Sequence, residues 1–477
     1  MKGSTLKHKV VGGLFWQYFQ RIGAQTVSFI VSIILARLLT PDDFGTIALI
    51  GVFITICNIF IDSGFGNALI QRKSIDEIDT SSVFYTNLGV SLILYIGLFF
   101  LSPLIASFYE VAELCPLLRV LSLQLIAMAL SCVQNAILVR EMKFKLNFYI
   151  SISSVIASSA VGLTCAYSGY GVWSLVYSQL TMQIANAAGY WILVGWRPRA
   201  VFSVERVKGL FDYGSKILAG SMLNVIYNNI YNLVIGKRYS TVELGFYNRG
   251  QIIPTLLVEN AANTINSVMF PALSKIQDDR VRFLEVVRKM VSVVAFIVFL
   301  LMGILLPLST PLIKVLLTDR WLPCVPFMQI VCITVCFTPF ILINSAILTA
   351  LGKSGKYLKG VTLSKILSIL IILAASFINV YIMVASGIVA AIISVFIMSH
   401  WNNALIGYNR KMMCRDIIPS MFLSIVVGLS VFGLTQIDLN DIITVLLGAF
   451  IGTGIYIGLA YALHFRQITF LKEVLRK

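Results

Sequence analysis

The chain has 477 residues, of which 58% are hydrophobic and only 12% are charged. A soluble domain usually carries about 25% charged residues, so this composition excludes a soluble enzyme, a secreted disulfide-stabilised scaffold and a disordered chain. The formal net charge of +16 comes from 37 lysines and arginines against 21 acidic residues. In so apolar a chain this excess indicates the positive-inside bias of a membrane protein rather than a nucleic-acid partner.

Long apolar runs separated by short polar segments predict fourteen membrane-spanning helices, because one span needs about 20 apolar residues. The predicted fold class is therefore an all-α polytopic membrane protein. Tight turns are expected at Gly169–Gly171 and at Ser386-Gly387, where paired spans follow one another closely. In chain order, the predicted spans are 13–36, 44–70, 82–108, 116–139, 148–168, 171–195, 210–236, 247–274, 290–317, 325–351, 358–380, 381–408, 416–436 and 441–464.

The distribution of basic residues predicts the orientation. Fourteen spans place both termini on one side of the membrane, and 29 of the 37 lysines and arginines fall on that side. Seven fall on the other side, and Arg21 lies within the first span. The positive-inside rule then predicts that both termini are cytoplasmic. All the connecting loops are short, so no extramembrane domain is expected.

An internal repeat is visible at an offset near 200 residues. The segment 36–45 after the first span resembles the segment 236–245 after the seventh. Six spans separate the copies, so both have the same orientation, as in transporters built from parallel repeats. The predicted organisation is an N-terminal lobe of spans 1–6 (1–205), a C-terminal lobe of spans 7–12 (206–408) and two appended helices (409–477). Duplication without alternating access remains open. The matched pairs are Arg37 with Lys237, Thr40 with Ser240, Asp43 with Glu243, and Gly45 with Gly245.

Polar residues recur on single faces of equivalent spans in the two halves. Because polar groups are costly at membrane depth, such faces indicate a cavity between the lobes. Hydrogen bonding between packed helices is the alternative explanation for the amides and serines. The candidate cavity residues are Gln17, Arg21 and Gln25 in span one, Lys216, Asn224, Asn228 and Tyr231 in span seven, and Asn263 in span eight.

Charged residues in these spans suggest an anionic substrate. Arg21 and Lys216 suit a phosphate group, as a planar donor fork and a point charge respectively. Lys216 could instead extend to the cytoplasmic interface. Asp62 and Glu259 are the candidate carboxylates for coupling to an ion gradient, while Asp62 could also be a solvated end residue or an ion-pair partner of Arg21.

Other chemistry is not indicated. The position five before Gly352 is Ile347 rather than glycine, so Gly352-Lys353-Ser354 is not the end of a phosphate-binding loop. The three histidines are dispersed, and the cysteines resemble small apolar packing residues, so no metal site is expected. No loop is long enough for a membrane-embedded polysaccharide polymerase or glycosyltransferase of the usual kind. The chain is therefore expected not to be an enzyme and to need no cofactor.

Several runs resemble a known family. The run LARLLTPDDFG and the run DSGFGNALIQR are similar to those of polysaccharide transporter (Wzx-type) flippases of the lipopolysaccharide and colanic-acid exporter subgroup. That family belongs to the multidrug/oligosaccharidyl-lipid/polysaccharide exporter superfamily. The resemblance covers most of spans one to twelve and fades over 409–477. It is carried by 35–45, 62–72, 140–144, 169–176, 196–198, 244–249 and 270–275.

The resemblance implies two six-helix lobes around a central cavity, in a multidrug-extrusion-like fold. It also implies a substrate, an oligosaccharide repeat unit linked to undecaprenyl diphosphate, such as an O-antigen or exopolysaccharide unit. This substrate would be flipped across the bacterial inner membrane, with Arg21 as a counterpart of the cavity arginines of a related lipid flippase. Membrane lipids, a polysaccharide polymerase and glycosyltransferases are the expected partners, and a proton or sodium gradient is the expected driving force. A cation-coupled multidrug or small-molecule antiporter of the same fold is the alternative.

Overall fold

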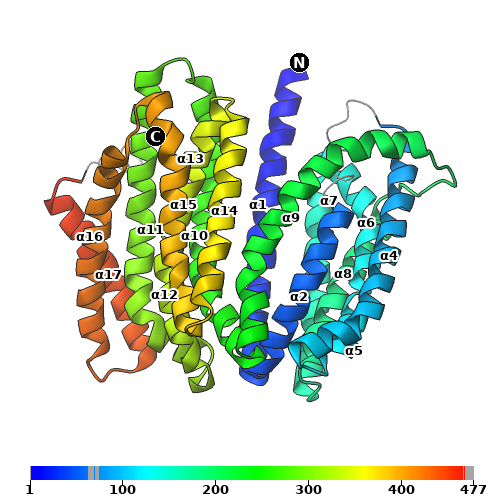
Figure 1. Ribbon diagram of the computed structural model, residues 1–477, viewed down its shortest axis with the longest axis horizontal. Helices are drawn as coiled ribbons and strands as arrows, with labels where there is room; N and C mark the ends of the chain where they lie inside the picture. The colour runs from blue at the N-terminus through cyan, green and yellow to red at the C-terminus, as the bar shows by residue number, and fades with distance from the viewer. Residues whose placement is uncertain (1, 63–68, 70–74, 466, 468–477) are drawn as a thin grey trace. The chain divides into compact units, whose positions relative to one another are not determined.

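The structure is a computed structural model that describes all residues except 1, 63–68, 70–74, 466 and 468–477 (Figure 1). The elements of the described residues are helices, which confirms the predicted all-α class. Each predicted span overlaps a helix, although residues 63–68 and 70 of the span 44–70 lie outside the described residues. The elements are α1 (Lys2–Leu38), α2 (Pro41–Asp62), α4 (Glu77–Tyr109), α5 (Leu114–Leu121), α6 (Gln124–Arg140), α7 (Phe144–Tyr167), α8 (Trp173–Leu193), α9 (Val204–Arg238), α10 (Thr241–Lys275), α11 (Arg280–Leu316), the 3-10 helix η1 (Asp319–Cys324), α12 (Val325–Val335), α13 (Thr338–Ala350), α14 (Ser354–Ala375), α15 (Val380–Ile406), α16 (Arg410–Thr435) and α17 (Asp441–Ala462).

Among the described residues, ten segments are long and apolar enough to cross a membrane, and 22–38 is a shorter apolar helix. The length and apolar character of these segments are those of a multi-pass membrane protein. Two predicted spans are broken helices: 116–139 corresponds to α5 and α6, and 325–351 to α12 and α13. The second break precedes Pro339, whose nitrogen carries no hydrogen and cannot bond to the carbonyl group four residues earlier.

One predicted turn is confirmed and one is wrong. Gly169 and Gly171 have positive φ angles of 80° and 54° in the connection between α7 and α8. Ser386 and Gly387, in contrast, lie inside α15. The connection before α15 is 376–379, and the side chain of Asn379 accepts a hydrogen bond from the N–H of Ile382 at 2.7 Å. An asparagine cap of this kind starts the helix, and a single glycine within an apolar run does not end it.

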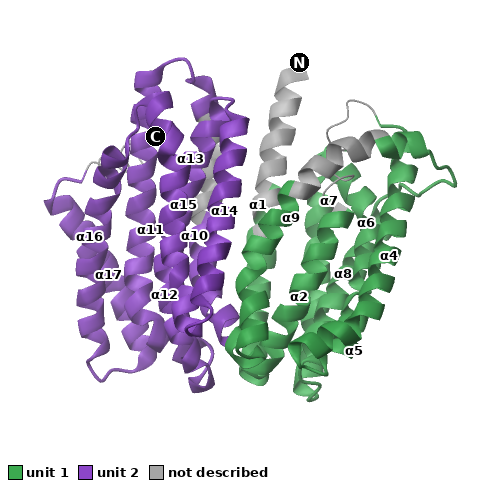
Figure 2. Cartoon of the chain, viewed as in Figure 1, with its two compact units in different colours: residues 1–245 green, residues 246–477 purple. Residues whose placement is uncertain are grey.

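The chain divides into two compact units, Met1–Gly245 and Phe246–Lys477 (Figure 2). In unit 1, α7 packs against α1 and α8, while α6 packs against α4 and α8. The connection from α8 to α9 lies along the start of α4. The backbone N–H groups of Arg199 and Ser203 donate to the buried hydroxyls of Ser81 and Ser82, each at 3.0 Å. These bonds satisfy hydroxyl groups that would otherwise be buried without partners.

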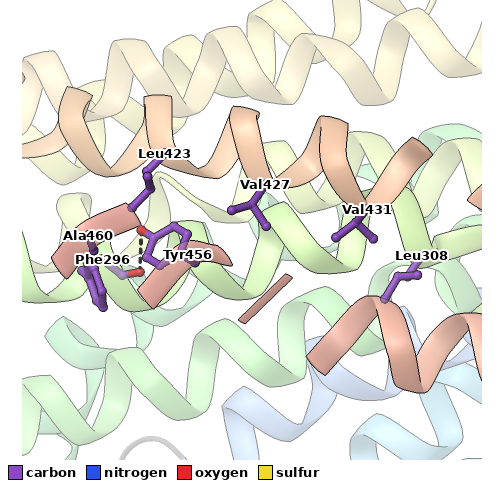
Figure 3. Packing of buried hydrophobic residues seen from close by; sticks show 7 residues of the cluster. All are labelled: Phe296, Leu308, Leu423, Val427, Val431, Tyr456 and Ala460. Atoms are coloured by element: carbon purple, nitrogen blue, oxygen red, sulfur yellow. Dashed lines mark hydrogen bonds between the residues drawn. The ribbon is translucent and has the colours of Figure 1, made fainter. Parts of the chain in front are cut away.

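In unit 2, the helices α16 and α17 pack on α11. Their contact is a buried cluster in which the Tyr456 hydroxyl donates to the carbonyl oxygen of Phe296 at 3.0 Å (Figure 3). The helices approach closely at Gly303, where a Cβ atom would collide with Ser424. The two helices at the end of the chain are thus an integral part of unit 2. The cluster consists of Phe296, Leu308, Leu423, Val427, Val431, Tyr456 and Ala460.

An ion pair joins α11 to α16 at one end of this contact. The guanidinium of Arg288 donates to both carboxylate oxygens of Asp416, at 3.0 and 2.7 Å. The hydroxyl of Tyr408, in the connection between α15 and α16, donates to the same carboxylate at 3.3 Å. Burial raises the pKa of Tyr408, so its hydroxyl remains a donor at neutral pH. The Asp416 side chain is only 7% exposed, and these bonds compensate for the burial of its charge.

Candidate functional site

The predicted cavity residues lie on four helices. Gln17, Arg21 and Gln25 are on α1, and Asp62 ends α2. Lys216, Asn224, Asn228 and Tyr231 are on α9, and Glu259 and Asn263 are on α10. The side chains of Gln17, Arg21, Asp62, Lys216 and Asn263 lie outside the described part of the structure, so their assignment to a cavity stays a prediction.

The described members of this set on α9 form an open polar stripe. Asn224 and Asn228 are exposed and one helical turn apart. One turn earlier, a Cβ atom added to Gly220 would meet no atom of the described residues within 4 Å. Tyr231, on the same helix, is half-buried, as is Gln25 on α1. Exposed amides on a helix of a membrane protein need a polar medium, because lipid offers them no hydrogen bonds.

A second open polar face lies on the helix α2. Thr55 is exposed on an otherwise largely buried helix, and its hydroxyl donates to the carbonyl oxygen of Gly51 at 2.7 Å. A Cβ atom at Gly51 would meet nothing within 4 Å. Asn58, one turn beyond Thr55, is half-buried. This face lies in unit 1 with the α9 stripe, whereas the exposed Glu259 on α10 belongs to unit 2.

The turns that begin α2 and α10 cross each other within unit 1. A Cβ atom at Gly45 would overlap the carbonyl oxygen of Thr241, and one at Gly245 would overlap the carbonyl oxygen of Pro41. The two contacts are reciprocal, because 41 and 241, like 45 and 245, are matched positions of the repeat. The hydroxyl of Thr241 also donates to the carboxylate of Asp42. Only glycine lets the two backbones approach this closely.

Matching caps form the two crossing turns. The backbone N–H of Thr40 donates to Asp43 at 2.8 Å, and the N–H of Asp43 donates to the Thr40 hydroxyl at 3.3 Å. At the matched position, the N–H of Glu243 donates to the Ser240 hydroxyl at 3.1 Å. The reciprocal pair of Thr40 and Asp43 is a capping box, and the bond to the Ser240 hydroxyl is one of the same two bonds in the second copy. The repeated residues that the sequence singled out are therefore the ones that start both helices and allow them to cross.

An ion pair beside the crossing was not predicted. The ammonium of Lys237 lies 3.0 Å from the carboxylate of Glu110 and donates to the carbonyl oxygen of Phe108 at 2.6 Å. It also lies 4.8 Å from the centre of the Phe108 ring. These contacts join the end of α9 to the end of α4. Nothing in the sequence indicates this pair, because its members are 127 residues apart.

The fold defines the class of protein. The structure is similar to that of a lipid II flippase, MurJ, in an inward closed conformation, with a TM-score of 0.75 and 16% identity over 96% of this chain and 100% of the other. It is also similar to an inward-facing multidrug resistance transporter of the MATE family, with a TM-score of 0.62 and 18% identity over 80% of this chain and 95% of the other. The chain therefore has the transporter fold that the resemblance implied.

A family model described as polysaccharide biosynthesis protein matches residues 34–326, and the chain belongs to that family. The lipopolysaccharide biosynthesis protein WzxC of Escherichia coli is 25% identical over 69% of this chain and 67% of its own length. The succinoglycan biosynthesis transport protein ExoT of Rhizobium meliloti is 26% identical over 72% of this chain and 68% of its own length. The teichuronic acid biosynthesis protein TuaB of Bacillus subtilis is 24% identical over 73% of each chain. The predicted family resemblance is thus confirmed.

Proposed function

We propose that this protein is a flippase that moves an oligosaccharide linked to undecaprenyl diphosphate across the plasma membrane. The family membership supports a role in polysaccharide biosynthesis, and ExoT is a relative whose name describes a transport protein. The observation that carries the proposal is the open polar stripe of Asn224 and Asn228 on a helix of such a chain. Amide side chains there can bond to sugar hydroxyl groups while the polyprenyl tail remains in lipid.

The charged residues have separate roles in this proposal. Arg21 and Lys216 bind the diphosphate, for which a guanidinium supplies a bidentate donor fork. Asp62 and Glu259 couple transport to a proton or sodium gradient. Moving one charge through 100 mV supplies about 2.3 kcal/mol, which is enough to bias a two-state carrier. A transporter of this kind performs no covalent chemistry, so the protein is proposed not to be an enzyme.

The orientation follows from the basic residues. With 29 lysines and arginines on the side of the termini and seven on the other, both termini are proposed to be cytoplasmic. The crossing of 41–45 and 241–245 would then face the outside. In alternating access this crossing must separate when the carrier opens outward, since it joins the first helix pairs of the two repeats. A polysaccharide polymerase and glycosyltransferases are the proposed partners on either side of the transport step.

A reconstituted flipping assay tests the proposal. Proteoliposomes containing a fluorescent oligosaccharide linked to undecaprenyl diphosphate are expected to show flipping that Arg21→Ala abolishes and Arg21→Lys partly retains. Oxidation of an Asp42→Cys/Thr241→Cys pair, in a chain whose native cysteines are replaced, is expected to stop flipping, and reduction to restore it. Full flipping by a stable Arg21→Ala protein would exclude the arginine as a diphosphate ligand. Gradient-driven uptake of lipophilic cations without flipping would favour the multidrug antiporter instead.

A further inference from the structure

A cluster of aromatic side chains joins α1 to the first turns of α7. This cluster, called the aromatic ledge, consists of Trp16, Phe19, Phe148 and Tyr149. The ring of Trp16 on α1 lies 5.4 Å from that of Phe148 and 6.3 Å from that of Tyr149, both on α7. Phe19, one turn after Trp16, lies 5.4 Å from Phe148. The two helices are also joined where the side-chain amide of Gln20 donates to the hydroxyl of Ser151 at 2.7 Å. The ledge is therefore a built contact between two packed helices rather than a set of separate surface rings.

A lysine lies over this ledge. The ammonium of Lys145 is 5.6 Å from the centre of the Trp16 ring and 6.0 Å from that of Tyr149. Lys145 is exposed, and it forms no ion pair with a carboxylate of the described residues. The neighbouring Lys143 differs, because its ammonium lies 2.6 Å from the carboxylate of Glu141. Among the described residues, the Lys145 ammonium therefore lies against ring faces and against no carboxylate.

Exposed apolar side chains lead away from the lysine along both helices. On α7, Tyr149 is 47% exposed and Ile156, two turns further, is 58% exposed. On α1, Phe19 is 53% exposed and is followed by Ile22 and Ile30 at 60% and 52%. Both packed helices therefore carry exposed apolar side chains beyond the aromatic rings, and the cation lies at the ring end. Tyrosine and tryptophan at such a position are typical of the membrane–water interface.

We propose that this surface, defined by Lys145, Trp16, Phe19, Tyr149 and Ile156, binds an anionic phospholipid of the surrounding bilayer. The phosphate group contacts the Lys145 ammonium, and one acyl chain lies along the exposed stripe of α1 and α7. An unpaired lysine favours an anionic over a zwitterionic headgroup, since each basic residue near an anionic membrane surface contributes about 1 kcal/mol. The ring faces hold the ammonium in place without neutralising its charge. Nothing in the proposed transport of a lipid-linked oligosaccharide requires this site.

The test is a binding measurement on the full chain. Native mass spectrometry of the detergent-solubilised protein gives the dissociation constants of dioleoyl phosphatidylglycerol and of dioleoyl phosphatidylcholine. Lys145→Gln is expected to weaken phosphatidylglycerol binding about five-fold, to the level of phosphatidylcholine. The matched control, Lys143→Gln, removes the same charge two residues away and is expected to change binding by less than about two-fold, because that lysine is already paired at the surface. Trp16→Leu is expected to weaken binding of both lipids.

Three outcomes would overturn the proposal. Equal losses in Lys145→Gln and Lys143→Gln would mean that only the diffuse charge of the turn attracts the lipid. Displacement of phosphatidylglycerol by inorganic phosphate at millimolar concentration would mean that the site does not recognise a lipid. Tighter binding of undecaprenyl phosphate than of phosphatidylglycerol, lost in Lys145→Gln, would identify a polyprenyl phosphate as the occupant instead. Since no arm measures flipping, failure here leaves the proposed transport function untouched.

Discussion

Replacing Gly45 by alanine is expected to disrupt the crossing of the turns that begin α2 and α10. The added Cβ atom would overlap the backbone carbonyl oxygen of Thr241, which has no side-chain rotamer that could relieve the collision. Overpacking of this kind typically costs about 1–3 kcal/mol. At 1.4 kcal/mol for each factor of ten, the equilibrium between the crossed and the separated state would shift by about 5- to 150-fold.

The assay measures the rate of disulfide formation between Asp42→Cys and Thr241→Cys in membranes, with and without Gly45→Ala. The rate is expected to fall in the alanine variant, since the two cysteines are less often in contact. Gly51→Ala is the matched control, because it lies on the same helix and its Cβ atom would meet nothing within 4 Å. The double variant Gly45→Ala/Gly245→Ala should lower the rate of disulfide formation by less than the sum of the two single effects, because the two sites are neighbours. Equal cross-linking rates in Gly45→Ala and Gly51→Ala would refute the view that the glycine holds the crossing.

Four further substitutions test the packing of the units. Arg288→Ala is expected to lower the free energy of unfolding of unit 2 by about 2–3 kcal/mol, because the buried Asp416 carboxylate then keeps only the Tyr408 hydroxyl of its described donors. Denaturant titration in micelles measures this free energy. An effect no larger than that of the exposed Lys289→Ala would contradict the prediction. Asn379→Ala should destabilise the start of α15 by about 1 kcal/mol, which thermal melting would detect, whereas Asn379→Ser should restore most of the loss. Asn87→Leu should be neutral or stabilising in the same melts, since neither amide atom of this buried side chain has a hydrogen-bond partner among the described residues. Asn344→Leu should cost about 1–3 kcal/mol, because it removes the oxygen that accepts a hydrogen bond from the buried amide of Asn402.

The helical fold was predictable because a membrane imposes one strong rule, that every backbone group in lipid must be paired within its own helix. Apolar length therefore predicts each span. The failure at Ser386-Gly387 shows the limit of that rule: glycine is tolerated inside membrane helices, and the real boundary was a single asparagine at 379. The breaks between α5 and α6 and between α12 and α13 were likewise not visible in the apolar pattern.

For the candidate site, the sequence could predict only which polar residues share one face of a helix. The four-residue spacing places Asn224 and Asn228 on one face of α9, and both side chains are exposed. Their place in a cavity stays a prediction. No spacing rule could find Lys237 with Glu110, or Arg288 with Asp416, since those partners come from distant helices and their pairing depends on tertiary packing. For the same reason, nothing in the sequence distinguishes Lys145 from Lys143, which pairs with Glu141.

The reciprocal crossing explains why both copies of the repeat carry glycine at the turn. At a two-fold contact, residue i of one copy meets residue j of the other, and j meets i in return. Position 45 lies against the backbone of Thr241, and position 245 lies against the backbone of Pro41. Neither position has room for a Cβ atom, and both residues are glycine. One turn further, the constraint is absent. Leu49 is buried and packs at Gly236, whereas its counterpart Arg249 is buried with its guanidinium 5.9 Å from the Trp321 ring. The two copies are therefore alike at the crossing and differ one helical turn away from it.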